Sequence, residues 1–348
     1  MNTDTKRIRI AVDAMGGDFA PKNEIEGALL AINSLESTSP IEIILLGNET
    51  EIKETMETMN IRNDNISIVH TNEVITMHDD PVVAIKTKRD SSMIKSIELL
   101  KENKVDAFIS AGNTGAMLTT STLLLGRIEG VTRPSIGTFL PTMTPNPTLL
   151  IDAGATVDCQ ARFLYEYAIM GSIYYKEIMK IDNPTVGLLN VGEEKSKGTT
   201  TLIEAYKLLE SNKNINFLGN IEGRDILQGK TNLVICDGYV GNVILKLAES
   251  FFMVVKHAIK QFAEVSFLNK LKAGFAYPVL KEVFSQFNYE IYGGVPLLGV
   301  QGIVIIGHGS SSPLAIKNMI LSAVNSFKND ICNKIKKELN KESKNNNN

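Results

Sequence analysis

Short apolar runs rich in β-branched residues alternate along the chain with longer segments in which apolar residues recur at helical spacing. This alternation predicts a mostly parallel β-sheet with helices on both of its faces. The run IVII at 303–306 is apolar throughout, which is typical of a strand buried on both sides. The predicted strands span 8–12, 41–46, 66–69, 107–110, 149–152, 185–190, 233–236 and 303–306. The predicted helices include 21–35, 94–103, 115–125, 162–179 and 201–209.

Six of the predicted strands end in polar turns that contain glycine. Glycine has no Cβ, so the backbone of such a turn can approach a ligand closely. Ligands of open α/β sheets bind outside the carboxyl ends of the strands, and six such turns on one edge predict a single polar cleft. The turns are residues 13–18, 110–115, 152–155, 190–198, 237–242 and 307–310.

The turn at 307–310 belongs to the stretch IVIIGHGSSSP, which predicts a strand, a tight turn and the start of a helix. Ser310, Ser311 or Ser312 can cap that helix. The free N–H groups and the positive dipole end of a helix attract anions, so a phosphate or carboxylate group could bind there. A single turn of this kind is more often an ordinary connection, but its recurrence at six strand ends favours a binding site.

Residues 251–287 contain no predicted strand. Apolar residues recur there at helical spacing in two blocks, and the second block begins after Pro278. Between the blocks lies SFLNKLKAGFAY, in which apolar residues are mixed with lysines. The pattern predicts a helical hairpin whose tip either forms a core or dimer contact or enters a membrane surface. The residues of this tip are Phe267, Leu268, Leu271 and Phe275.

Composition and charge narrow the class of protein. The chain has 348 residues and a net charge of -3, which provides no electrostatic case for a nucleic-acid partner. Its three scattered cysteines predict no disulfide framework and fit a reducing cytoplasm. The sequence shows no signal-peptide pattern and no uninterrupted apolar run of transmembrane length. Length alone is compatible with about two domains or with one large α/β unit. We expect one large α/β domain over 1–330, with the hairpin inserted at about 251–287, and a polar, disordered tail over 331–348.

Common cofactor signatures are missing from the sequence. There is no G-x-x-x-x-G-K-[ST], no G-x-G-x-x-G after a strand, no G-x-S-x-G and no H-E-x-x-H. The acidic pair at 79–80 fits a helix start better than a cation site. We therefore expect no cofactor and no metal, and the missing dinucleotide fingerprint argues against a dehydrogenase.

Two lysines are candidates for chemistry. Lys195 and Lys197 lie in the glycine-bounded loop 190–198, after a strand predicted to be buried. A lysine in that position can contact a phosphate or a developing oxyanion. Glu193 and Glu194 are adjacent in sequence, so a pair of solvated surface lysines is the alternative interpretation.

Amide and imidazole side chains occupy three of the turns. Asn242, close to Asp237, could donate to an oxyanion or cap the next helix, and Asn113 presents the same choice. His308 is the only histidine in a glycine-rich turn, where it could donate to phosphate or act as an acid.

Eight motifs, taken in order, identify a family resemblance over residues 8 to about 325. The chain resembles the PlsX family of bacterial phosphate acyltransferases. The chain departs from the family pattern in two respects: lysines at 86 and 88 stand where arginine is usual, and Ala161 replaces a proline. The motifs are AVDAMGGDFAP, MHDDPVVAIKTKRDSSM, FISAGNTGAML, RPSIGTFLPT, LLIDAGATVDC, VGLLNVGEEKSKGT, CDGYVGNVILK and GIVIIGHGSSSP.

The resemblance implies a three-layer α/β/α fold like that of isopropylmalate dehydrogenases and phosphotransacetylases, acting as a homodimer. It implies synthesis of acyl-phosphate from acyl carrier protein thioester and inorganic phosphate, without a cofactor. It also implies a cytoplasmic protein attached peripherally to the inner face of the cell membrane. The product would pass to a membrane-bound glycerol-3-phosphate acyltransferase and start phospholipid synthesis.

On this resemblance, the candidate residues acquire roles. Lys197 and Asn242 would stabilise the oxyanion, and His308 would help to hold phosphate. The expected phosphate- and substrate-binding residues are Asp13, Gly16, Gly17, Ser110, Gly112, Asn113, Thr114, Lys195, Asp237, Gly241, Gly309 and Ser310. Two alternatives stay open: a phosphotransacetylase-like enzyme that uses acyl-coenzyme A, and a non-catalytic membrane scaffold for lipid-synthesis enzymes.

Overall fold

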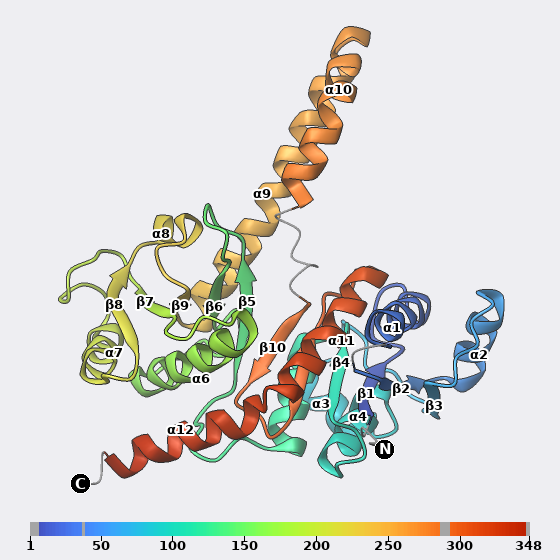
Figure 1. Ribbon diagram of the computed structural model, residues 1–348, viewed down its shortest axis with the longest axis horizontal. Helices are drawn as coiled ribbons and strands as arrows, with labels where there is room; N and C mark the ends of the chain where they lie inside the picture. Colours follow the sequence, from blue (N-terminus) through green and yellow to red (C-terminus); the bar gives the residue numbers. More distant parts are fainter. Residues whose placement is uncertain (1–6, 37–38, 286–292, 346–348) are drawn as a thin grey trace, which may run out of the picture.

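The computed structural model describes residues 7–36, 39–285 and 293–345 (Figure 1). Eleven strands form one sheet in the order β3-β2-β1-β4-β11-β10-β5-β6-β9-β7-β8. Helices cover both faces of this sheet, so the predicted mostly parallel α/β/α fold class is confirmed. The strands are β1 (Ile8–Asp13), β2 (Ile41–Gly47), β3 (Ile66–His70), β4 (Ala107–Ser110), β5 (Ser135–Leu140), β6 (Thr148–Ile151), β7 (Thr185–Leu189), β8 (Asn216–Ile221), β9 (Leu233–Ile235), β10 (Val295–Leu298) and β11 (Ile303–Ile306).

The sheet consists of two parallel blocks joined by two antiparallel strands. Strands β3, β2, β1, β4 and β11 form the first block, and β6, β9, β7 and β8 form the second. Between them, β10 is antiparallel to both β11 and β5, and β5 is antiparallel to β6. Because strand direction reverses at each of these three antiparallel pairs, the strands of the second block run opposite to those of the first. The expectation that all six turns share one edge of the sheet is therefore wrong.

Each block is buried on both faces, as its apolar strands predict. In β1, Ile10 and Val12 pack with α1 and α11 on one face, while Ala11 packs with α4 and α5 on the other. The second block packs against α6, α7 and α12 on one face and against α8 and the start of α9 on the other. The helices are α1 (Lys22–Leu35), α2 (Glu49–Thr58), α3 (Pro81–Thr87), α4 (Ser92–Lys101), α5 (Thr114–Thr120), continued by the π-helix η1 (Ser121–Leu125), α6 (Ala161–Met179), α7 (Thr200–Ser211), α8 (Gly223–Gln228), α9 (Gly238–Glu264), α10 (Phe267–Ser285), α11 (Pro313–Lys328) and α12 (Ile331–Asn345).

Sequence patterning missed three strands, β5, β8 and β10. β10 has only four residues and includes Pro296, which cannot donate a backbone hydrogen bond. β5 lies between two prolines, and β8 contains Gly219 at a positive φ of 101°. Gly and Pro are depleted in strands, so each of these segments has a weak strand signal, and neighbouring strands determine their conformation.

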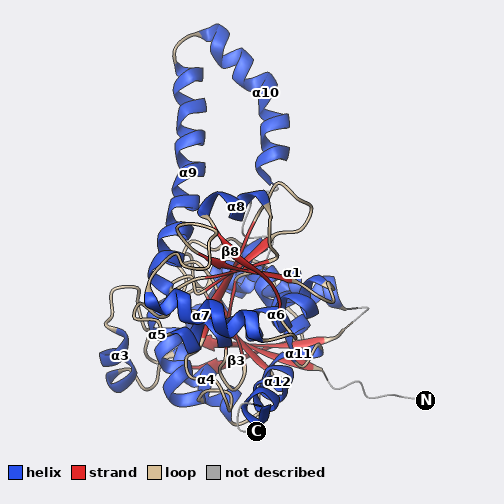
Figure 2. Ribbon diagram, turned by 90° about the vertical axis from the view of Figure 1, so that its left-hand side faces the viewer, coloured by secondary structure: helices blue, strands red, loops and turns tan. Residues whose placement is uncertain are grey.

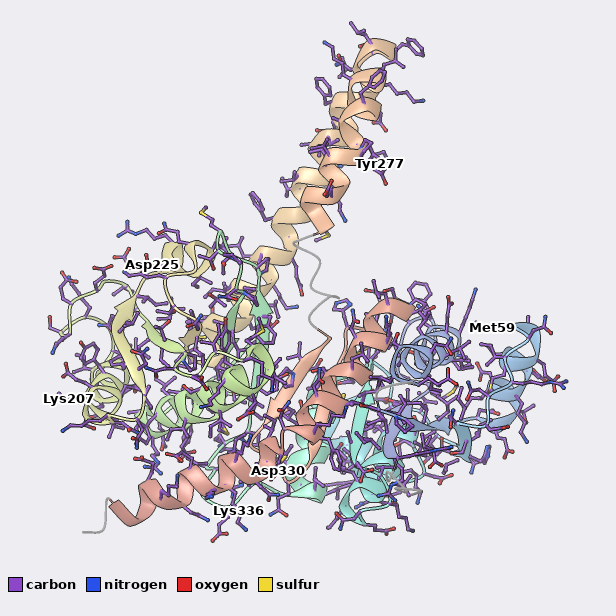
Figure 3. The ribbon with its side chains drawn as sticks, in the orientation of Figure 1. Met59, Lys207, Asp225, Tyr277, Asp330 and Lys336 are labelled. Carbon is purple, nitrogen blue, oxygen red and sulfur yellow. The ribbon has the colours of Figure 1, made fainter. Side chains whose placement is uncertain are left out.

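The helical hairpin extends well beyond the body of the molecule (Figures 1 and 2). Its helices α9 and α10 are separated only by residues 265–266. Two predicted boundaries are wrong: α9 begins at Gly238, and Pro278 lies inside α10 instead of at the start of the second helix. The predicted end of the hairpin at 287 lies outside the described residues. Tyr277 illustrates the exposure of α10, with its side chain in solvent on the projecting arm (Figure 3).

The predicted disorder of the tail is also wrong for residues 331–345, which form α12, and the rest of the predicted tail lies outside the described residues. Asp330 adopts a left-handed conformation (φ 53°) that turns the chain from α11 into α12 (Figure 3). Ile331, Ile335 and Leu339 then recur every four residues, and all three pack into the core beside α6. The charged residues between them face outward, as Lys336 does (Figure 3). The segment is polar in composition, but one face of the helix carries a narrow apolar stripe. The helix is stable because this stripe packs against α6.

We expect Leu339→Ala to destabilise the protein by about 2–5 kcal/mol, because it removes a fully buried side chain and leaves a cavity. Urea unfolding followed by circular dichroism measures the change. Lys337→Ala, on the exposed face of the same helix, serves as the control and should change stability little. Equal effects of the two substitutions would show that α12 contributes no packing.

Candidate active site

Two turns of the first block meet around Asp13. The Ser110 hydroxyl donates to Asp13 Oδ2 at 2.7 Å, and the Met15 amide donates to Oδ1 at 3.2 Å. Ser110 Oγ in turn accepts from the Gly112 amide at 2.9 Å. A Cβ on Gly16 would lie 2.5 Å from Asp13 Oδ2, so only glycine leaves room for this contact. Asp13 therefore acts as a buried link between the turns at 13–18 and 110–115.

The surroundings of Asp13 shift the pKa of its carboxyl group in opposite directions. Burial raises the pKa of the carboxyl group, whereas hydrogen bonds from Ser92, Ser110 and the Met15 and Gly16 amides lower it. The net pKa is above the ordinary value for aspartate. Asp13 shapes the turns, and its buried carboxyl group has little surface left for a substrate.

The turn at 307–310 joins the same group. The Asp18 amide donates to the Gly309 carbonyl at 2.7 Å. His308 Nδ1 lies 2.8 Å from Ser310 Oγ and accepts from the Ser310 amide at 3.2 Å. Because Nδ1 accepts a hydrogen bond, the neutral ring carries its proton on Nε2. His308 is exposed and can therefore donate to a ligand at the surface of the turn.

Asn113 has a structural role. Its Oδ1 accepts from the Ala116 amide at 3.0 Å, so Asn113 is the N-cap of α5, which was the alternative interpretation of this residue. Its Nδ2 lies 3.2–3.4 Å from the carbonyl oxygens of residues 76, 77 and 79. The side chain holds this loop beside the turns, and the neighbouring Thr114 is exposed at the start of the helix.

A second group of turns lies at the carboxyl ends of β6 and β9. Asp152 is fully buried at a φ of 71°, an uncommon conformation for a residue other than glycine. Its carboxylate accepts from the amides of Gly154, Ala155 and Thr156 at 3.2, 2.6 and 3.0 Å. Burial raises the pKa of Asp152 to about 6, against the effect of these three amides. Backbone strain held by buried hydrogen bonds is frequent at functional sites.

The first turn of α9 packs directly on this strained turn. Asp237 is the N-cap of α9 and accepts from the Val240 amide at 2.9 Å, so Asn242 is not a cap. A Cβ on Gly241 would lie 1.9 Å from the Asp152 carbonyl oxygen, and only glycine permits this approach. Gly154 also lies next to Asn242, because a Cβ on Gly154 would be at an ordinary contact distance of 3.5 Å from Asn242 Cβ. The contacts hold Asn242 next to the turn at 152–155.

The two lysines of the loop at 190–198 differ in their contacts. Lys195 forms an ion pair with Glu210 and lies 5.5 Å from the ring centre of Tyr206. The carbonyl of Lys197 accepts from Asn190 Nδ2 at 3.0 Å, which holds the end of the loop. Lys197 forms no ion pair within the described part of the chain, and its side chain is exposed. Lys197 is thus the more available cation for a ligand.

Neither adjacent glutamate forms an ion pair with Lys197 in the described part of the chain. Glu193 pairs with Lys230 across the loop, and the backbone of Glu194 accepts from Asn220 Nδ2 at 2.8 Å. Lys195, which is exposed and paired with Glu210, fits the alternative interpretation of a solvated surface lysine. Lys197 is also exposed, so its role as a ligand-binding cation stays a prediction.

Apolar contacts connect the two groups of turns. Ala153, Ala155 and Leu245, from the second group and α9, pack into the same cluster as Ala116 and Met117 of α5. The polar turns thus adjoin one shared apolar cluster despite the reversal of the strands. A cavity of about 390 Å³ lies elsewhere, between α6 and α12.

Two acidic residues of these groups were not among the predicted site residues. Asp152 was recognised only as part of a turn, because a positive φ cannot be read from sequence. Glu24 is buried beside Gly17, although an acidic residue in the first turn of a helix indicates only a favourable interaction with the helix dipole.

The cysteines near the second group are poor nucleophiles. Burial and the charges of Asp152 and Asp237 raise the pKa of Cys159 to about 12 and raise that of Cys236 well above its ordinary value. A thiol reacts as its thiolate, which both environments disfavour at neutral pH. The site is therefore better suited to binding an external nucleophile than to forming an acyl-cysteine.

Comparison with known proteins identifies close sequence relatives. The profile of a family described as "Fatty acid synthesis protein" matches residues 8–334. A phosphate acyltransferase from Dictyoglomus turgidum is 44% identical over 334 residues, covering 96% of this chain and 98% of that protein. Phosphate acyltransferases from Clostridium tetani and Chlorobaculum parvum are 42% and 45% identical, covering 95% and 91% of this chain and 98% and 94% of those proteins.

Solved structures with the same fold are more distant in sequence. The EutD phosphotransacetylase from Staphylococcus aureus has a TM-score of 0.60 at 16% identity, covering 92% of this chain and 94% of its own. A phosphotransacetylase from Streptococcus pyogenes has a TM-score of 0.61 at 15% identity, covering 93% and 94%. At this identity the likeness concerns the fold alone.

We expect Gly241→Ala to destabilise the protein by about 1–3 kcal/mol, because the new methyl group would overlap the Asp152 carbonyl. Denaturant unfolding monitored by circular dichroism tests this. Gly274→Ala, inside α10 where a Cβ meets nothing within 4 Å, is the matched control and should be neutral or slightly stabilising. A neutral Gly241→Ala would mean that α9 does not pack tightly on the turn.

Proposed function

Because the chain belongs to the PlsX family of phosphate acyltransferases, we propose that it transfers the acyl group of an acyl carrier protein thioester to inorganic phosphate. The observation that carries this proposal is the family match over nearly the whole chain, together with two groups of glycine turns beside one apolar cluster. The product would be an acyl-phosphate, and the proposed pathway is phospholipid synthesis.

The proposed reaction needs no catalytic triad. A phosphate oxygen attacks the thioester carbonyl carbon and forms a tetrahedral intermediate. The C–S bond then breaks, and the carrier thiol leaves as a thiolate that takes up a proton. Phosphate is largely ionised near neutral pH, its second pKa being roughly 6–7, and a thiol with a pKa of about 8.5 is a good leaving group. The protein has only to position the reactants and stabilise the oxyanion.

In this proposal, Lys197 and Asn242 stabilise the oxyanion. Lys197 supplies an available ammonium group, and the Asn242 amide supplies a hydrogen-bond donor held against the turn at 152–155. Asp152 acts as a positioning residue, because its carboxylate organises the turn on which Asn242 rests.

Phosphate would bind at the turns of the first block. The side chains of Ser110 and Asn113 already form hydrogen bonds within the turns and to a neighbouring loop. The remaining donors for phosphate are mainly backbone N–H groups and His308. Backbone amides of glycine turns are well suited to an anion, because no Cβ keeps it at a distance. Gly16, Gly17 and Gly309 lie together at this point.

Acyl-coenzyme A is the alternative donor, as the phosphotransacetylase fold suggests. Purified protein is incubated with phosphate and either thioester, and thiol release is measured. We expect faster turnover with acyl carrier protein. Preference for acyl-coenzyme A would favour the phosphotransacetylase-like reaction, and no turnover with either donor would favour a scaffold.

The hairpin is the basis for a proposed location at the membrane. Phe267 and Phe275 are 77% and 85% exposed, and Lys270 and Lys272 lie among them. Among the described helices, α9 alone is long and apolar enough to cross a membrane, which by itself is weak support for spanning. We favour a peripheral tip that inserts apolar side chains while its lysines contact anionic lipid.

This location would suit the proposed chemistry. A cytoplasmic protein attached to the inner face of the membrane could pass a lipophilic acyl-phosphate to a membrane-bound glycerol-3-phosphate acyltransferase. We further propose a homodimer, since exposed apolar residues also lie along the lower hairpin, among them Val243 and Leu247.

We expect Lys197→Ala and Asn242→Ala each to lower kcat about 100-fold, because each removes an oxyanion donor. Phosphate-dependent thiol release from acyl carrier protein thioester measures the rate. Lys195→Ala is the matched control, because this lysine of the same loop is already paired with Glu210, and it should retain most activity. A near-normal rate would exclude Lys197 or Asn242 from the mechanism.

We expect the double substitution Phe267→Ser and Phe275→Ser to weaken binding to phosphatidylglycerol vesicles by more than about tenfold, because two exposed aromatic side chains can no longer enter the bilayer. Vesicle sedimentation measures binding. Leu123→Ser, at an exposed apolar position on the body, is the control. Unchanged sedimentation of the double variant would argue against a membrane tip.

A further inference from the structure

A buried carboxyl group lies directly behind the proposed phosphate turns. Glu24, in the first turn of α1, is 2% exposed. A Cβ on Gly17 would lie 2.3 Å from Glu24 Oε1 and 3.5 Å from the Gly309 carbonyl oxygen. The carboxyl group of Glu24 therefore lies where the turns at 13–18 and 307–310 meet.

Glu24 has an incomplete set of hydrogen bonds. Its Oε2 is buried and has no partner within the described part of the chain. An ionised carboxylate in such a position is costly, and the group retains its proton instead. Burial, with the charges of Asp13 and Asp18 nearby, raises the pKa of Glu24 to about 8. At neutral pH the group is thus an uncharged acid.

We propose that Glu24 is a positioning residue that makes phosphate affinity depend on pH. In its protonated form, Glu24 supports the Gly17 turn and places no charge behind the anion. In its ionised form, it adds a negative charge beside the Asp13 and Asp18 carboxyl groups and repels the incoming phosphate. This inference rests on the proposed use of phosphate as a substrate.

A substitution of Glu24 alone separates its effect from those of its titratable neighbours. Asp13 from β1 and Asp18 from the turn are the charged groups that act on Glu24, and His308 is the imidazole of the adjacent turn. From α11, Ile316 packs on Gly27 of α1 and brings no charge. All of these residues stay unchanged when Glu24 alone is replaced, so a difference in pH dependence belongs to Glu24.

The direction of the pH effect follows from the raised pKa. Below about pH 8 the folded protein holds a neutral Glu24, and above it the group ionises. Inorganic phosphate is already mostly a dianion above about pH 7.5, so its own titration contributes little there. If phosphate binds only when Glu24 is neutral, the apparent KM for phosphate should rise about 25-fold between about pH 7.5 and 9.5, because the ratio of ionised to neutral Glu24 grows tenfold per pH unit and the neutral fraction falls from about three quarters to about 3%.

The experiment measures kcat and the KM for phosphate over this pH range, with acyl carrier protein thioester at saturation and the phosphate-free rate subtracted. In Glu24→Gln, which is uncharged at every pH and similar in shape, KM should stay low and flat while kcat follows that of the wild type. Glu26→Gln, on the same helix but only half-buried, is the matched control and should retain the wild-type rise.

The outcomes separate this inference from the proposed function. An equal rise of KM in the wild type and Glu24→Gln overturns the role of Glu24 but leaves the phosphate reaction intact. Absence of any phosphate-dependent turnover in the wild type overturns both. Should Glu24→Gln fail to fold, Glu24→Met provides a second uncharged variant with the same expected flat profile.

A second measurement requires no catalysis. A carboxyl group with a raised pKa in the folded state binds its proton more tightly there than in the unfolded chain. The wild type should therefore lose stability as the pH rises from about 4.5 to 8, because the unfolded chain ionises first. Urea unfolding of Glu24→Gln should show a smaller loss over this range, and identical slopes would contradict the proposal.

Discussion

The antiparallel strands β5 and β10 at the centre of the sheet determine which parts of the chain can meet. They reverse the direction of the second parallel block, so the carboxyl ends of its strands do not follow the same edge as those of the first. The polar turns therefore form two groups. Packing of α9 and the turn at 152–155 against the cluster that contains Ala116 and Met117 places these groups beside one apolar core.

Each group is organised by a buried aspartate at the end of a strand. Asp13 follows the apolar run of β1 and bonds to Ser110, whereas Asp152 follows β6 and accepts three amide hydrogen bonds. Both carboxyl groups have raised pKa values because of burial. Glycines complete the two groups, since Gly16 and Gly241 leave space that a side chain would fill. The proposed reactive groups, Lys197, Asn242 and His308, stand at the surface of this rigid framework.

The hairpin obeys different physical constraints from the body. Its apolar side chains face solvent far from any core of this chain, and a water-exposed apolar surface of this kind is favourable only when something covers it. A membrane surface and a second copy of the chain both meet that requirement. For an enzyme that would make a lipophilic product, either arrangement would keep the acyl chain close to apolar surroundings.

The sequence by itself determined the fold class, most strands of the parallel blocks, the hairpin and the turns, because apolar periodicity and glycine act locally. The family motifs also indicated the chemistry. Only the tertiary structure decided the order and direction of the blocks, the helical state of α12 and the separate roles of Lys195 and Lys197. It also revealed the burial of Glu24 and the strained backbone of Asp152. These features depend on contacts between residues far apart in sequence, and no local pattern of side chains encodes such contacts.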